Sequence, residues 1–153
     1  MIRPGNIDQW IFLGATVGHG YPDGESRSFS LNSPGMIQIV QMEPGAYRYL
    51  KQHGNYADGT MLSLSFYNTQ EKPSPAVDGV VQKDLASFEI HILDREKYSD
   101  KRAFFLFQNG DNTAGMIPKG NACIDCHEKD AEYDGTFVQF YPVLRDRLLP
   151  EGL

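Results

Sequence analysis

Both cysteines of the chain, Cys123 and Cys126, lie three residues apart, and His127 follows the second one directly. On a helix, positions i, i+3 and i+4 fall on one face, so these three side chains can contact one flat group together. Haem meets that requirement, because its two vinyl groups can each take a thiol while the imidazole binds the iron. Cys-x-x-Cys-His is the attachment signature of c-type haem. The motif therefore predicts a helical turn that carries one covalently attached haem c per chain, with His127 bound to the iron.

Other uses of two cysteines fit this pattern less well. A zinc site usually needs four protein ligands, and His19, His53 and His91 show no finger-like spacing to the cysteine pair. A thioredoxin-like redox pair belongs early in a βαβ unit, and this pair comes late in the chain. A disulfide between cysteines three apart closes too small a loop to stabilise a protein much.

The position of the motif bears on the sixth coordination site of the iron. Residues 128–153 follow the motif and contain no methionine and no histidine. Upstream candidates for a sixth ligand are Met36, Met42, Met61, Met116, His19, His53 and His91. Ordinary core or surface roles explain such residues more readily, because methionine fills cores and a lone histidine is weak evidence for a ligand. We therefore expect His127 to be the only protein ligand, which favours binding of a small molecule over simple electron transfer.

The composition is that of one domain over residues 1–153, without an evident affinity for nucleic acid or membranes. Hydrophobic residues make up 41% of the 153 positions, enough for a real core. The net charge of −6 comes from acids spread along the chain, and no basic cluster could track phosphates, so we expect no nucleic-acid partner. No apolar run is long enough to cross a bilayer, so we expect no membrane insertion.

Short runs rich in β-branched or aromatic residues indicate a mainly β fold. Five such runs predict strands, at residues 35–42, 61–68, 87–94, 103–109 and 136–144. Residues 43–54 predict a helix, because Pro44 suits its first turn and Gly54 its C-terminal stop. Residues 7–18 predict a shorter helix that buries Trp10. The expected fold is one α+β domain built on an antiparallel sheet with a few short helices.

Residues 123–146, CIDCHEKDAEYDGTFVQFYPVLRD, resemble the C-terminal signature of the cytochrome P-460 family: the haem motif, an acidic spacer, and a strand ending in aromatic-Tyr-Pro-x-Leu. Residues 8–20, 40–60 and 87–94 match the family's order of elements. The resemblance implies a mainly antiparallel β fold, a periplasmic homodimer and a five-coordinate c-type haem. The family includes enzymes that oxidise hydroxylamine. It also includes the cytochromes c′-β, which bind nitric oxide or carbon monoxide without known turnover.

Two departures from the enzymes separate these branches. In the enzymes, a lysine on the strand after the Asp-Gly-Thr turn is cross-linked to the haem. Alignment with residues 56–68 puts Leu64 at that place, with Leu62 and Phe66 as neighbours on the same face, and no lysine occurs from Gln52 to Glu71. The enzymes also carry a distal arginine, and residues 30–42 contain none.

The resemblance also assigns roles to the residues around the haem. Leu62, Leu64 and Phe66 would form an apolar distal wall in contact with the cofactor. Glu89 corresponds to a distal carboxylate of the enzymes and is the one base we can name for hydroxylamine oxidation. A solvated strand residue is the plain alternative for Glu89. Several aromatic residues would line the haem or simply form sheet core, namely Phe104, Phe105, Phe107, Phe137 and Phe140.

Three functions therefore stand after the sequence alone. The expected one is a periplasmic mono-haem cytochrome whose open distal site binds nitric oxide or carbon monoxide. The alternatives are a hydroxylamine-oxidising enzyme of the P-460 type and a six-coordinate electron carrier with a periplasmic redox partner. Because haem c is attached outside the cytoplasm in bacteria, we expect export, with any signal peptide missing from this sequence.

Overall fold

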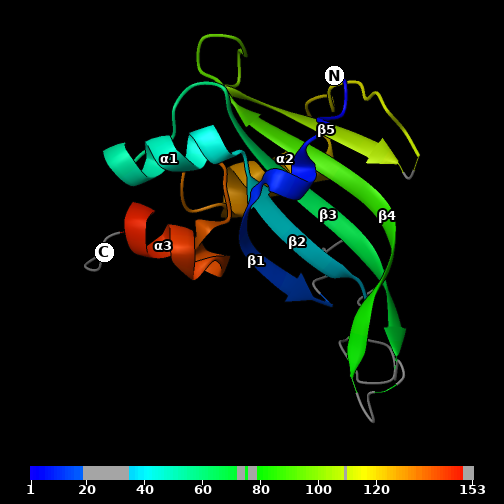
Figure 1. The fold of residues 1–153 in the computed structure, drawn as a ribbon. Coiled ribbons are helices and arrows are strands. Elements are labelled where there is room, and N and C mark those ends of the chain that lie inside the picture. Colours follow the sequence, from blue (N-terminus) through cyan, green and yellow to red (C-terminus); the bar gives the residue numbers. More distant parts are fainter. Residues whose placement is uncertain (19–34, 72–74, 76–78, 109, 150–153) are drawn as a thin grey trace.

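Five strands form one antiparallel sheet in the computed structural model, which describes residues 1–18, 35–71, 75, 79–108 and 110–149. They lie side by side in chain order (Figure 1). The strands are β1 (Ile11–Val17), β2 (Ile37–Met42), β3 (Thr60–Glu71), β4 (Val80–Leu93) and β5 (Arg102–Gln108). Each strand pairs antiparallel with the next, so the sheet is a meander. The predicted α+β, mainly β fold is confirmed.

A short helix fills the connection between β2 and β3. This helix, α1 (Pro44–His53), begins after Glu43, whose carboxylate accepts a hydrogen bond from the Ala46 amide at 2.7 Å. It ends at Gly54, which has a left-handed φ of 71°. Proline in the first turn and glycine after the last are favoured at these positions, so the predicted helix is confirmed. The remaining elements are η1 (Ile7–Gln9), α2 (Ala122–Asp130), η2 (Val138–Phe140) and α3 (Pro142–Leu148).

Two predicted elements differ from the structure. Residues 136–144, predicted as a strand, form η2 and the start of α3, because Pro142 lacks the amide hydrogen that a strand ladder needs and suits a first helical position. Residues 7–18, predicted as a helix, contain only η1 before β1 begins. The β-branched residues Thr16 and Val17 favour a strand there. The predicted burial of Trp10 is confirmed.

The register of the strands divides the side chains between two faces of the sheet. Leu64 lies opposite both Val40 and Glu89, and Leu62 lies opposite His91. Directly opposed residues share a face, so these five side chains point to one side. The other face carries a separate buried cluster made of Trp10, Phe88, Ile90, Ala103, Phe105 and Phe107.

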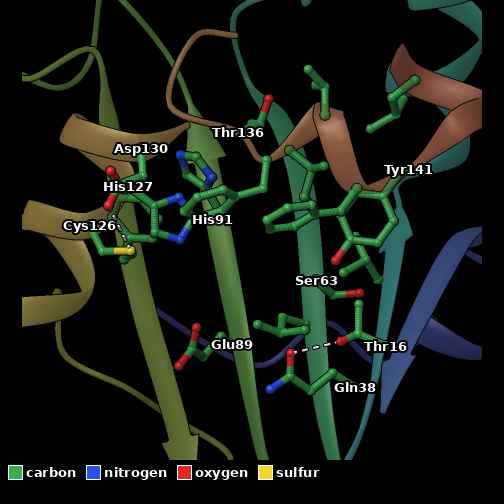
Figure 2. Close-up of a pocket in the computed structure, with 18 residues that line it drawn as sticks. Thr16, Gln38, Ser63, Glu89, His91, Cys126, His127, Asp130, Thr136 and Tyr141 are labelled. Atoms are coloured by element: carbon green, nitrogen blue, oxygen red, sulfur yellow. Dashed lines mark hydrogen bonds between the residues drawn. The ribbon is translucent and has the colours of Figure 1, made fainter. Parts of the chain in front are cut away.

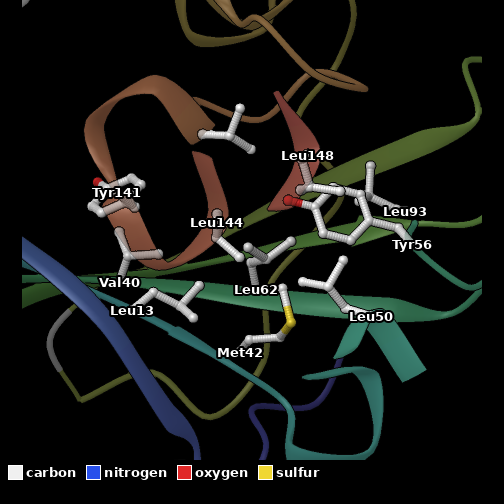
Figure 3. Packing of buried hydrophobic residues seen from close by; sticks show 11 residues of the cluster. Leu13, Val40, Met42, Leu50, Tyr56, Leu62, Leu93, Tyr141, Leu144 and Leu148 are labelled. Atoms are coloured by element: carbon white, nitrogen blue, oxygen red, sulfur yellow. The ribbon is translucent and has the colours of Figure 1, made fainter. Parts of the chain in front are cut away.

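The C-terminal elements cover the face that carries Leu62 and Leu64. Figure 3 shows this packing between the sheet, α1 and α3. Its buried members include Leu13, Val40, Met42, Leu50, Tyr56, Leu62, Leu93, Tyr141, Leu144 and Leu148. Burying one large apolar side chain stabilises a fold by roughly 1.5–3 kcal/mol, so this cluster holds the C-terminal segment on the sheet. Across the described residues, no helix has both the length and the apolar character needed to cross a membrane.

Candidate haem site

A cavity of about 270 Å³ lies between the sheet and the C-terminal segment. Leu62, Leu64 and Glu89 line it from the sheet, and Cys126 and His127 line it from α2 (Figure 2). Further lining comes from the residues after α2, among them Thr136, Phe137, Val138 and Tyr141. The fold thus brings most of the residues singled out in the sequence to one mostly apolar hollow.

Helix α2 presents the cysteine motif on a capped first turn. Asn121 precedes the helix, and its side-chain oxygen accepts a hydrogen bond from the Cys123 amide at 3.0 Å. Both thiols are free, and the Cys126 thiol donates to Asp130 with its sulfur 3.8 Å from the carboxylate oxygen. Burial raises the pKa of both thiols, and nearby carboxylates add to the shift. The raised pKa keeps both thiols protonated at neutral pH. Separately, the two cysteines form no disulfide with each other.

The ring of His127 is oriented by one backbone hydrogen bond. Its Nδ1 lies 2.8 Å from the carbonyl oxygen of Gly135. A carbonyl only accepts, so Nδ1 carries the hydrogen and Nε2 keeps a free lone pair. Burial lowers the pKa of His127, and the nearby Arg102 lowers it further. The ring is therefore a neutral imidazole in the form that ligates metals, oriented as metal-binding histidines usually are.

These residues fit a haem better than a bare metal ion. Among the described residues, no group of three or more His, Cys, Asp or Glu side chains is arranged to hold a metal ion. Haem needs only one protein ligand and an apolar surface for its ring. His127 would supply that ligand, and Phe104 and Phe137 flank its ring with ring centroids 4.7 Å away.

Comparison with known families decides between the remaining interpretations. Residues 8–138 match the family model of cytochrome P460. The chain belongs to the cytochrome P460 family. It is therefore a haem-binding cytochrome, and the resemblance noted in the sequence is confirmed. The match runs from the start of the sheet through α2 to η2, so it includes the whole cysteine motif. No curated protein matches the chain.

The sheet wall of this cytochrome P460 contains two of the three apolar residues predicted to contact the haem. Leu62 and Leu64 line the cavity. Phe66 points to the same face as these two but is buried farther along β3, opposite Gln38 and Ser87, and does not line the cavity. Their contact with haem stays a prediction.

Glu89 reaches the cavity from β4 beside Leu64. It is partly buried, and this burial raises the pKa of its carboxyl from 4.5 to about 7. A fully solvated strand residue would keep an ordinary pKa, so the environment of Glu89 differs from the plain alternative. The carboxyl can release or take up a proton near neutral pH.

The sequence interpretation missed a polar pair in the wall of this cytochrome. Thr16 on β1 donates a hydrogen bond from its hydroxyl to the Gln38 side-chain oxygen at 3.1 Å, and both residues line the cavity. Gln38 shares a face with Val40 and is almost fully buried. Alternation along β2 could have indicated Gln38, but Thr16 was hidden by the wrong helix prediction for residues 7–18.

Of the described upstream candidates for a sixth ligand, only His91 lines the cavity of this cytochrome; His19 lies outside the described residues. Burial lowers the pKa of His91 well below its usual value, so the ring is neutral. It stacks on Phe104 at 4.1 Å and contacts the edge of His127 at 5.5 Å between ring centroids. Two axial histidines must stand on opposite sides of a haem plane, whereas these two rings touch. The geometry therefore favours one axial histidine.

Proposed function

We propose that this cytochrome carries one haem c attached through Cys123 and Cys126, with His127 as the only protein ligand to iron, and binds nitric oxide or carbon monoxide on the open side. The observation that carries the proposal is the hydrogen bond from His127 Nδ1 to the Gly135 carbonyl. This bond leaves the lone pair of Nε2 available to bind iron beside an apolar cavity. When bound, haem supplies an iron that takes up small diatomic ligands. The protein would supply the axial ligand, the two cysteines that attach the haem, and a mostly apolar cavity wall.

The absence of an amine from the cavity favours ligand binding over turnover. Leu64 stands where the family's enzymes carry the cross-linking lysine, and its side chain lines the cavity. Among the lysines in the described ranges, none lines the cavity, and Lys51 and Lys83 lie at exposed positions. Lys72 lies outside the described residues. A haem held here would therefore remain an ordinary haem c.

Hydroxylamine oxidation is the second candidate function, and Glu89 is the observation that favours it. Oxidation of hydroxylamine releases protons, so it needs a nearby base. A carboxyl with a pKa of about 7 at the cavity wall is suited to collect them. The polar pair of Thr16 and Gln38 could also orient a polar substrate. Steady-state assays with hydroxylamine and an artificial electron acceptor, beside peptide mapping for a third haem link, separate the two functions.

Haem extraction and visible spectra of the purified holoprotein test the principal proposal. Holoprotein made with c-type haem maturation machinery should keep its haem on extraction into acidified organic solvent. Its ferrous form should be five-coordinate and should bind nitric oxide. Haem that extracts fully would contradict the covalent attachment, and a low-spin six-coordinate ferrous spectrum would move the protein to electron transfer. His127→Ala should lose the five-coordinate histidine-ligated spectrum while keeping the covalent haem.

We also propose that the protein is periplasmic and acts as a homodimer. Both statements rest on the attachment chemistry and on the resemblance to the family. The location predicts that haem loading requires export and periplasmic maturation, which expression with and without an export signal would measure. Light scattering of the purified holoprotein would measure the oligomeric state, and a monomer at micromolar concentration would contradict the dimer.

A further inference from the structure

The carbonyl that orients His127 belongs to a tight turn after α2. Asp134 and Gly135 both have positive φ, at 47° and 71°. Tyr133 and Thr136 close the turn through backbone hydrogen bonds of 3.4 and 2.8 Å. Two successive residues with positive φ in an Asp-Gly sequence are typical of the tight type I′ turn. The direction of the Gly135 carbonyl therefore depends on what holds this turn in place.

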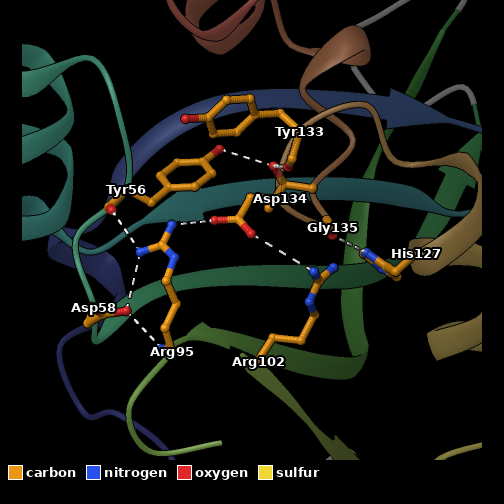
Figure 4. A network of polar contacts seen from close by, with 9 residues as sticks. Tyr56, Asp58, Arg95, Arg102, His127, Tyr133, Asp134 and Gly135 are labelled. Carbon is orange, nitrogen blue, oxygen red and sulfur yellow. Dashed lines mark hydrogen bonds and ion pairs between the residues drawn. The ribbon is translucent and has the colours of Figure 1, made fainter. Parts of the chain in front are cut away.

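Arginine and aspartate side chains hold the turn from the sheet side (Figure 4). The Arg102 guanidinium packs directly against Gly135, so that a Cβ at this position would overlap it and the guanidinium would have to shift. The same guanidinium lies 3.9 Å from one oxygen of Asp134. Arg95 donates a hydrogen bond to the other oxygen of Asp134 at 2.7 Å. Asp134 is thus held between two cations, and Arg102 lies directly against the residue that binds His127.

The ion pairs around the turn form one cluster of four side chains, with a partly buried end and an exposed end; its members are Asp58, Arg95, Arg102 and Asp134. Arg102 and Asp134 have side chains that are 18% and 22% exposed, whereas Arg95 and Asp58 are 41% and 42% exposed. Arg95 also donates to Asp58 at 3.3 Å, which ties the turn to the start of β3. Ion pairs between exposed side chains contribute little, so the partly buried end carries most of the effect on the turn.

We infer that Arg102 and Asp134 are positioning residues for His127, which fix the Gly135 carbonyl against Nδ1 and set the electrostatic field beside the axial ligand. This inference rests on the proposed function. Within the described part of the chain, Nδ1 of His127 faces a carbonyl rather than a carboxylate, so the ring stays a neutral ligand rather than gaining imidazolate character. The positive charge of Arg102 favours the ferrous over the ferric state, and the negative charge of Asp134 opposes it. The charged pair therefore tunes the reduction potential from outside the haem cavity.

A merely structural cluster would stabilise the C-terminal segment without affecting the iron. Three variants distinguish the two roles. Arg102→Gln removes the positive charge, and Arg102→Lys keeps it but loses the flat guanidinium that lies against Gly135. Asp134→Asn removes the negative charge while keeping a residue type that accepts positive φ, so the turn should still form. Asp58→Asn is the matched control, because it breaks the exposed end of the same cluster and does not touch the turn.

The experiment uses covalently loaded holoprotein and measures the reduction potential, the iron–histidine stretching frequency and thermal unfolding. We expect the potential to fall in Arg102→Gln and to rise in Asp134→Asn. Arg102→Lys should shift the stretching frequency with a smaller change in potential. Asp58→Asn should match the wild type in both the reduction potential and the stretching frequency.

Two results would overturn the inference. If Arg102→Gln and Asp134→Asn match Asp58→Asn in potential and frequency, the cluster acts on stability alone. If both potentials move in the same direction, general damage to the site explains them better than charge. Should Arg102→Gln fail to fold, Asp134→Asn alone decides the question by the sign of its shift. A wild type that lacks covalent haem or the iron–histidine band would overturn the proposed function itself, and this inference with it.

Discussion

The two walls of the cavity are built in different ways. The wall formed by α2 and the turn after it depends on contacts between near neighbours. His127 and Gly135 are only eight residues apart, and Gly135 lies in the four-residue turn that follows α2. The sheet wall is assembled from all five strands, so Thr16, Gln38, Leu64, Glu89 and Phe104 meet only through strand register. A local motif can specify an iron ligand, whereas the chemistry opposite it depends on pairing between distant segments.

The largest expected effect breaks the turn that orients His127. Gly135→Ala should cost about 3 kcal/mol of unfolding free energy, because the new Cβ displaces Arg102 and an alanine at positive φ is strained. Gly54→Ala is the matched control, since Gly54 has the same φ of 71° and open space around it. It should cost about 1 kcal/mol. Denaturant unfolding measures both, and equal losses would mean that the contact with Arg102 contributes nothing.

The next effect concerns the sheet wall and depends on pH. The pKa of Glu89 is raised from 4.5 to about 7, so the folded state binds this proton more tightly than the unfolded chain. Glu89 therefore destabilises the fold progressively as pH rises from about 4.5 to 7, and the loss is complete above that. A shift of this size corresponds to roughly 3 kcal/mol, and the partial exposure of the carboxyl reduces it. Glu89→Gln should therefore be about 2 kcal/mol more stable than the wild type at pH 8 and equally stable at pH 4. A stability difference that does not change with pH would contradict the raised pKa.

A smaller effect is expected where the two walls meet. The Nε2 atom of His91 is buried and has no hydrogen-bond partner among the described residues. His91→Phe should therefore stabilise the protein by about 1 kcal/mol, because it removes an unsatisfied polar group and keeps the stacking on Phe104. The ferrous spectrum should not change. Conversion from six- to five-coordinate iron in this variant would show that His91 is an axial ligand.

The smallest expected effect tests the polar pair of the sheet wall. Thr16→Val keeps the shape of the side chain and removes its hydrogen bond to Gln38. Such a bond contributes about 1 kcal/mol or less, and the affinity for carbon monoxide should change less than threefold because this ligand depends little on donors. Flash photolysis of the carbon monoxide complex measures the affinity. A change of tenfold or more would mean that the distal side is not a passive apolar wall.

Patterns within short segments predicted the fold, and the helix that carries the cysteine motif, well. Pro44 and Gly54 mark the ends of α1, and the spacing of Cys123, Cys126 and His127 predicted the helix α2. That His127 binds iron stays a prediction. The hydrogen bond to Gly135 could also have been suspected from the Asp-Gly pair, which is typical of tight turns. These features depend on residues that are close in sequence, where spacing alone defines geometry.

Features that depend on distant segments were predicted less well. Residues 136–144 have the composition of a strand, but Pro142 starts α3, and the segment packs across the sheet as η2 and α3. The helix predicted over residues 7–18 is mostly β1, because its β-branched residues favour a strand and pairing with β2 on a distant segment completes it. That error concealed Thr16, and with it the polar part of the cavity wall.

The chain of contacts from Asp58 through Arg95 to Asp134 joins segments that are 37 and 39 residues apart in sequence. Arg95 follows β4 and Asp58 precedes β3, so these contacts link the turn to both strand ends. The buried hydrogen bond between Tyr56 and Thr136 and the apolar cluster beneath α3 add the stronger contacts that hold the same segment on the sheet. The C-terminal segment and the sheet should therefore open as one cooperative unit rather than by local fraying. Amide hydrogens of the turn, such as that of Thr136, should then exchange with solvent as slowly as those of β3 and β4. His127 would keep its orientation for as long as the sheet itself stays folded.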